Sequence, residues 1–110
     1  MPYFLHQWRY KDQQVKEMLL GAAARDRAEI VRTAVQAFGG TLHQFFYSFG
    51  EYDGVAVTDF ADHETAMACV TTIFAQGRIE QVRTTSLFTS EQMLKVMSVA
   101  EEVFKAGAPR

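Results

Sequence analysis

Apolar residues recur every second position in some segments of the chain, as in a strand, and with helical spacing in others. Residues 2–10 are rich in aromatic side chains and contain no internal breaker, which predicts a first strand. Strand alternation divides this segment into two faces, of which one carries Phe4, His6, Trp8 and Tyr10. The other face of the same strand carries Tyr3 and Leu5, so both faces present large side chains.

Helix-forming residues follow in two stretches. The first begins at Asp12 and is interrupted at Gly21. The second has Asp26 as its predicted N-cap and ends at Gly39-Gly40. Between those limits, apolar residues recur at helical spacing: Ile30, Val31, Ala34, Val35 and Phe38. We expect the charged run Arg25-Asp26-Arg27 to be solvated helix surface.

Two further strands are predicted around a glycine-bounded segment. Residues 41–49 and 55–60 are apolar and β-branched or aromatic, and residues 50–54 between them are typical of a β-hairpin connection. The turn does not fix the register of the two strands. A slip of one residue exchanges their faces, so the face occupied by His43 stays open.

The last third of the chain repeats the alternation of helix and strand. Asp62 is a predicted N-cap for a helix that ends at Gly77, and residues 78–88 form a less apolar strand that suits an edge. Thr89 to Gln92 matches a capping box. The final helix has an apolar face made of Met93, Val96, Met97, Ala100, Val103 and Phe104, and Glu101-Glu102 are expected on its solvated side.

The order β-α-β-β-α-β with an extra C-terminal helix predicts the α+β class. It specifies a ferredoxin-like sandwich, with an antiparallel sheet and its helices on one face. Residues 1–110 are enough chain for one domain, whose tail at 105–110 should fray. Phe45 and Phe46 place apolar groups on both faces of the sheet in any register. The uncovered face therefore predicts self-association as a homodimer or higher oligomer, or a cover formed by the C-terminal helix of the same or a neighbouring chain.

Aromatic residues reinforce the expectation of a shared second core. Ten of the fourteen lie on three predicted strands and the hairpin connection: Tyr3, Phe4, Trp8, Tyr10, Phe45, Phe46, Tyr47, Phe49, Tyr52 and Phe60. That number exceeds what one helix-covered face requires, so part of the set is predicted to meet another copy of the chain.

Charge and cysteine content narrow the classes of function. Eleven basic and thirteen acidic residues give a net charge of -2, without the basic excess of a nucleic-acid-binding protein. The single cysteine, Cys69, forms no intramolecular disulfide and is expected to be a small buried hydrophobe. Apolar runs are too short for a membrane span, and the N-terminus has no signal-peptide pattern. We therefore expect a soluble, cytoplasmic protein without nucleic-acid or membrane partners.

The hairpin carries a recognisable motif. Gly50-Glu51-Tyr52-Asp53 resembles the motif of the GYD domain family, which consists of small bacterial proteins. The resemblance extends to Gly39-Gly40, to residues 46–49 and 55–57, and to Val82-Arg83-Thr84-Thr85 with Leu87 and Thr89. It implies a ferredoxin-like protein of the dimeric α/β-barrel type, and it transfers no catalytic residue. On residue chemistry, Gly50 is expected to adopt an unusual backbone angle, Asp53 to bind backbone amides, and Tyr52 to cap the hairpin.

The candidate chemistry centres on strand histidines among aromatic residues. His6 and His43 are candidate proton acceptors and Tyr47 a candidate hydrogen donor, because histidine titrates near neutral pH. Candidate ligand-binding residues are Trp8, Phe45, Tyr47, Tyr52 and Asp53, which would form an aromatic pocket with a few polar groups on the open sheet face. His63 is expected to be a surface residue.

Two classes of function follow, and neither requires a cofactor. The first is a homo-oligomer that binds a small apolar or aromatic molecule. The alternative is a cofactor-independent enzyme, a monooxygenase or isomerase, by analogy with dimeric α/β-barrel proteins. We predict no metal site, because a site would have to combine His6 and His43 with an acid such as Asp59 and no metal-ligand spacing occurs.

Overall fold

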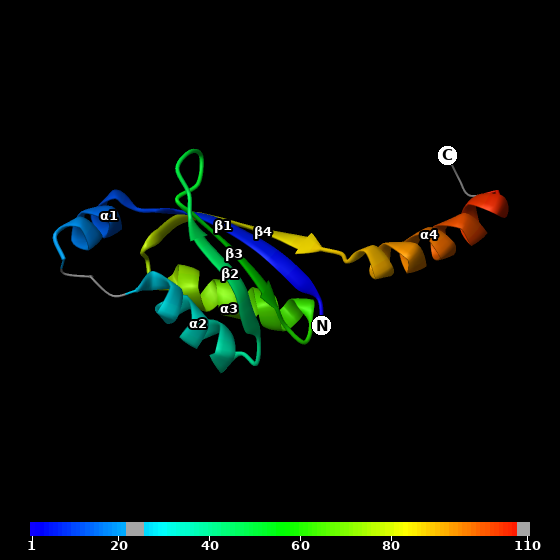
Figure 1. Ribbon diagram of the computed structural model, residues 1–110, viewed down its shortest axis with the longest axis horizontal. Coiled ribbons are helices and arrows are strands. Elements are labelled where there is room, and N and C mark those ends of the chain that lie inside the picture. Colours follow the sequence, from blue (N-terminus) through cyan, green and yellow to red (C-terminus); the bar gives the residue numbers. More distant parts are fainter. Residues whose placement is uncertain (22–25, 108–110) are drawn as a thin grey trace.

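The computed structural model describes residues 1–21 and 26–107, and Figure 1 shows a twisted sheet with two helices against one of its faces. In chain order the elements are β1 (Tyr3–Tyr10), α1 (Asp12–Leu19), α2 (Arg27–Ala37), β2 (Thr41–Tyr47), β3 (Gly54–Asp59), α3 (His63–Ala75), β4 (Ile79–Leu87) and α4 (Ser90–Lys105). The four strands have the order β2-β3-β1-β4, and every neighbouring pair is antiparallel. This arrangement confirms the predicted α+β, ferredoxin-like architecture, with α2 and α3 as the covering helices (Figure 1).

Capping side chains fix the starts of the helices where the sequence predicted them. Asp26 accepts a hydrogen bond from the Ala28 amide at 3.0 Å, and Asp62 accepts one from the Thr65 amide at 2.8 Å. At α4 the side chains of Thr89 and Gln92 form both bonds of a capping box. Each cap satisfies an amide that the first helical turn leaves without a partner.

The register places one set of β1 side chains beneath the helices. Phe4 lies opposite Thr58 and His6 opposite Ala56 on β3, and all four residues are buried. On β2 the pairing shifts between Leu42 and Gln44, so that the apolar side chains of Leu42 and Phe45 both pack into the core. This irregularity settles the hairpin register that the sequence left open.

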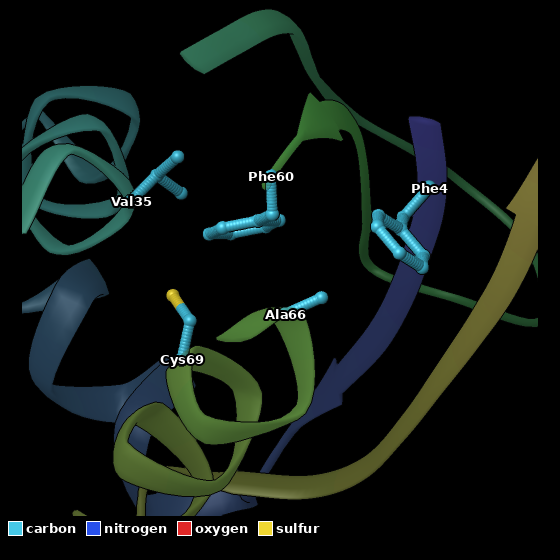
Figure 2. Packing of buried hydrophobic residues seen from close by; sticks show 5 residues of the cluster. All are labelled: Phe4, Val35, Phe60, Ala66 and Cys69. Carbon is cyan, nitrogen blue, oxygen red and sulfur yellow. The ribbon is translucent and has the colours of Figure 1, made fainter. Parts of the chain in front are cut away.

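The core consists of two clusters on the helix-covered face. Figure 2 shows Phe60 lying between Phe4 of β1 and Val35 of α2, with Cys69 and Ala66 of α3 beneath its ring. The second cluster joins Trp8, Leu42 and Ala56. Burial raises the pKa of the Cys69 thiol to about 11, so this cysteine is a packed hydrophobe as predicted.

Helix α4 leaves the sandwich and contacts none of the core. It projects from the end of β4, away from the sheet and from α2 and α3 (Figure 1), and none of its residues is buried. Its capping and its apolar positions agree with the sequence, but it does not cover the sheet of its own chain. Lys105 ends the helix in an ion pair with Glu101, and residues 108–110 of the predicted frayed tail lie outside the described residues.

A helix that spans a bilayer needs about 20 mostly apolar residues. Within residues 1–21 and 26–107, no helix combines the length and the apolar character needed to cross a membrane.

Candidate functional site

A cavity of about 100 Å³ lies between the sheet and the helices that cover it. Trp8 and His6 of β1 and Thr58 of β3 form its floor. Apolar side chains of α2 and α3, among them Val35 and Ile73, form its walls. Its exposed lining residues mark the opening, at the end of α3 and the start of β4: Phe74, Gln76 and Arg78. This cavity lies on the helix-covered face of the sheet. The pocket that the sequence predicts on the open sheet face is a separate site and stays a prediction.

His6 is held in this cavity as a neutral imidazole. Its Nε2 is 2.8 Å from Thr58 Oγ1, and its Nδ1 is 3.0 Å from Thr84 Oγ1. Burial lowers the pKa of His6 to about 4, because the charged form cannot be solvated there. At neutral pH one ring nitrogen therefore donates a hydrogen bond to a threonine hydroxyl and the other accepts one.

Two buried polar side chains that line the cavity each have one buried nitrogen without a hydrogen-bond partner. Gln14 of α1 is 3% exposed and Arg27 of α2 is 7% exposed. Within the part of the chain that the structure describes, nothing hydrogen-bonds to Gln14 Nε2 or to Arg27 Nε. A buried polar group without a partner is costly, so such groups call for an explanation.

Neither Gln14 nor Arg27 was predicted to belong to the site. Arg27 was expected to be solvated, and that expectation is wrong, whereas Arg25 lies outside the described residues. Arg27 precedes Ile30 and Val31 by three and four residues, so it shares their inward face of α2. This spacing was the available signal, and the charge of the side chain concealed it.

Aromatic side chains extend from the cavity along the sheet toward β2. Trp8 lines the cavity, and the ring centroid of Phe45 lies 5.4 Å from that of Trp8. Tyr47 follows at 5.3 Å from Phe45 and is mostly exposed. Tyr10 also lines the cavity, and burial raises the pKa of its hydroxyl, while the nearby Arg27 charge acts in the opposite direction. The structure thus brings Trp8 to the cavity and leaves Phe45 and Tyr47 beyond its lining.

The Gly50-to-Asp53 motif holds the end of β1 in place. Asp53 Oδ2 accepts a hydrogen bond from the Tyr10 amide at 2.9 Å, and the Asp53 amide donates to the Trp8 carbonyl at 2.8 Å. The Asp53 carboxylate therefore binds backbone, as predicted, and positions the two residues that line the cavity. Tyr52 contributes its backbone carbonyl, which accepts a hydrogen bond from the Ser48 hydroxyl.

The glycine requirement of this loop lies at a different position from the one predicted. We expected Gly50 to adopt an unusual backbone angle, but Gly50 has no positive φ and has open space around it. At Gly54, by contrast, a Cβ atom would overlap the indole ring of Trp8. Gly54 is therefore required by close approach of a side chain to the backbone rather than by a turn conformation.

The second strand histidine lies on the opposite face of the sheet. His43 Nε2 donates a 2.7 Å hydrogen bond to Asp59 Oδ2, and the Tyr3 and His43 rings form a T-shaped pair with 5.2 Å between their centroids. Asp59 is buried, and its Oδ1 has no partner among the described residues. His6 therefore does not meet His43 and Asp59, so the structure separates the three residues from which a metal site would have been assembled.

Comparison with known proteins identifies relatives at the level of family and fold. A family model described as the GYD domain matches residues 4–97. The crystal structure of TTHA0845 from Thermus thermophilus is similar, with 19% identity, a TM-score of 0.54, and coverage of 82% of this chain and 96% of that chain. The crystal structure of FFRP-DM1 is similar with 12% identity, a TM-score of 0.52, and coverage of 80% and 100%. No curated protein sequence matches the chain. At these identities the likeness shows the fold alone.

Proposed function

The chain belongs to the GYD domain family, and we propose that it binds a small apolar or aromatic molecule in the cavity between the sheet and helices α2 and α3. The observation that carries this proposal is the composition of the cavity. Its walls are apolar, Trp8 offers an aromatic surface, and two buried nitrogens in its lining lack hydrogen-bond partners among the described residues. Small-molecule sites have this form, a largely apolar concavity with a few polar groups that orient the ligand.

The size of the cavity limits the ligand. An engineered cavity of about 150 Å³ in another protein binds benzene. A cavity of about 100 Å³ that opens at Phe74 and Arg78 therefore suits one ring or a short chain, with any remaining part of the molecule in the opening.

Blocking the cavity tests the proposed function. Val70 of α3 lines the cavity, and Met67 on the same helix is exposed and does not. We expect toluene and benzyl alcohol to quench the fluorescence of Trp8, the single tryptophan, in the natural protein and in Met67→Phe. Val70→Phe should abolish the quenching while the protein keeps its cooperative unfolding transition. Equal quenching in the two variants, or none in the natural protein, would contradict the proposal.

We extend the proposal to the assembly, with two apolar surfaces as the interface. The open sheet face carries Leu5 and Val57, which pair across β1 and β3, together with the exposed Phe46 of β2. Helix α4 exposes a second set that includes Leu94 and Phe104. A homodimer or higher oligomer of the dimeric α/β-barrel type would cover the sheet face, and in the proposed assembly α4 packs on a neighbouring chain.

The enzyme alternative is favoured by one observation, the pair of His43 and Asp59. A carboxylate that accepts the Nε2 proton fixes the orientation of the imidazole and leaves Nδ1 as a proton acceptor. His6 is less suited to that role, because Thr58 and Thr84 occupy both of its nitrogens and its pKa is lowered. His43 would then be the base of a cofactor-independent monooxygenase or isomerase.

Oxygen uptake separates the two functions. Hydroquinone can supply its own electrons, since hydroquinone and dioxygen react to give hydroxyquinone and water. One atom of the dioxygen enters the quinone and the other enters water. A monooxygenase of this kind should consume dioxygen with such a substrate, lose that activity in His43→Gln, and keep it in the surface control His63→Gln. The binding proposal expects no uptake above the spontaneous rate in any of the three proteins.

A further inference from the structure

Two fully buried polar atoms of the cavity lining lack a hydrogen-bond partner among the described residues, and both are hydrogen-bond donors. Gln14 Nε2 and Arg27 Nε are both N–H groups, and both are buried. A ligand that satisfies them must therefore bring acceptor atoms. The other polar groups on the floor are already satisfied, because His6 uses both nitrogens on Thr58 and Thr84.

The charged side chains that line the cavity are all positive. Among the described residues that line it, the charged side chains are Arg27 in its interior and Arg78 at its opening, and no aspartate or glutamate accompanies them. The ion pairs of the described residues involve neither arginine. Asp53 is nearby, but its carboxylate lies outside the lining and accepts a hydrogen bond from the Tyr10 amide.

From these observations we infer that the ligand is a carboxylate with an apolar body, such as an aromatic or short aliphatic acid. This inference rests on the proposed function and names the chemical class of its ligand. The carboxylate meets Arg27 and Gln14, and the apolar part lies against Trp8 and the walls from α2 and α3. A guanidinium suits this role, because its planar fork matches the two oxygens of a carboxylate.

Physical chemistry disfavours the other ligand classes. A cation would be repelled by Arg27 and Arg78, and a neutral apolar molecule would leave the buried guanidinium without a counter-charge, which is costly in a medium of low polarity. A bulkier polyanion needs more donors than the small, mostly apolar cavity supplies. A monocarboxylate satisfies the charge and both donors within the available volume.

Benzoate, benzamide and benzylamine test the inference, since they share one ring and differ in charge. Each is titrated into the protein at pH 7 while the fluorescence of Trp8 is recorded. We expect benzoate to bind at least tenfold more tightly than benzamide, and benzylamine to be the weakest. Equal affinity of benzoate and benzamide would overturn the inference and leave the proposed function intact. If toluene is bound but none of these three probes is, the inference fails and the proposed function stands; if toluene is not bound either, both fail.

Variants of Arg27 and Gln14 test whether the preference for benzoate over benzamide arises from these two donors. Arg27→Gln should remove the tenfold preference for benzoate, whereas the control Arg32→Gln, on the exposed side of the same helix and paired with Glu29, should retain it. A second variant, Gln14→Glu, adds a negative charge to the cavity and should weaken benzoate at least tenfold while benzamide is unaffected. A benzoate preference that persists in Arg27→Gln and Gln14→Glu overturns the inference.

Discussion

At the scale of single residues, the end of β1 is fixed by two neighbouring residues, the aspartate Asp53 and the glycine Gly54. Asp53 holds the Tyr10 amide and the Trp8 carbonyl, and Gly54 leaves room for the Trp8 ring. The hairpin motif is therefore connected to the cavity through the backbone and the packing of Trp8. Tyr52 contributes a carbonyl to the same loop.

Gly54→Ala tests the packing of Trp8. The added methyl group would overlap the indole ring, so we expect a loss of about 1–3 kcal/mol in the free energy of unfolding, as for other overpacked sites. Gly50→Ala is the matched control, because Gly50 has open space and no positive φ, and its effect should stay within about 0.5 kcal/mol. Urea unfolding measures both. Equal stability of the two variants would show that the ring does not approach Gly54.

His6 makes stability depend on pH with a definite sign. Its pKa is about 4 in the folded protein, against an ordinary value of 6.5 that applies to the unfolded chain. Between these values the unfolded chain binds a proton that the folded protein does not, so stability falls as the pH falls from 6.5 to 4. The loss contributed by His6 is at most about 3 kcal/mol.

A variant isolates this contribution from that of other titrating groups. The loss of stability between pH 7 and pH 4 should be smaller in His6→Gln than in the natural protein, and unchanged in His63→Gln, because His63 is exposed. Denaturant unfolding at several pH values measures the difference. The same pH slope in natural protein and His6→Gln would contradict the buried, neutral imidazole.

At the scale of elements, hydrophobic periodicity and capping residues predicted most of the structure. The order of strands and helices, the caps at Asp26 and Asp62, the capping box at Thr89 and the edge position of β4 agree with the sequence. Each of these features depends on local chemistry. A cap needs only its own side chain and an amide two or three residues later.

Features that depend on distant partners could not be predicted in the same way. The face of His43 follows from the irregular pairing between Leu42 and Gln44, which is set by the packing of β2 on β3. The burial of Arg27 and Gln14 depends on which surface α1 and α2 meet, and their polarity indicated solvent instead. The sequence therefore indicated Trp8 and His6 as pocket residues, but it indicated neither this cavity beneath the helices nor its unpartnered donors.

Asp62→Ala tests the local stabilisation of α3. The variant removes the acceptor for the Thr65 amide, so the free energy of unfolding should fall, as it does when other helix N-caps are replaced by alanine. Glu64→Ala in the same helical turn keeps the cap and should lose less, about 0.3 kcal/mol from the helix dipole. Chemical denaturation of both variants provides the comparison, and a larger loss for Glu64→Ala would contradict the assigned cap.

At the scale of the whole molecule, the isolated chain is extended. Its radius of gyration is 17.6 Å, whereas a compact chain of this length has a value of about 13 Å. The difference reflects α4, which points away from the sandwich and buries none of its residues (Figure 1). Two apolar surfaces of one chain, the open sheet face and α4, thus lack a cover, which is the physical basis of the proposed assembly.

Light scattering tests that assembly. We expect a mass of at least twice 12.4 kDa for the natural protein. Phe46→Asp on the sheet face should shift the mass toward the monomer, because burial of a charge opposes association. Leu19→Asp, on an exposed apolar position of α1 outside both surfaces, is the control and should keep the larger mass. A natural protein that is monomeric at high concentration would contradict the assembly.

The central claim is that a small molecule binds on the helix-covered side of the sheet, beneath α2 and α3. Nuclear Overhauser contacts from the ring protons of saturating benzoate to assigned protons of the protein test its location most directly. We predict contacts to the Trp8 indole and to the Val35 methyl groups, which line the cavity. Contacts to Tyr3 and Val57 on the opposite face, without any to Trp8, would contradict it.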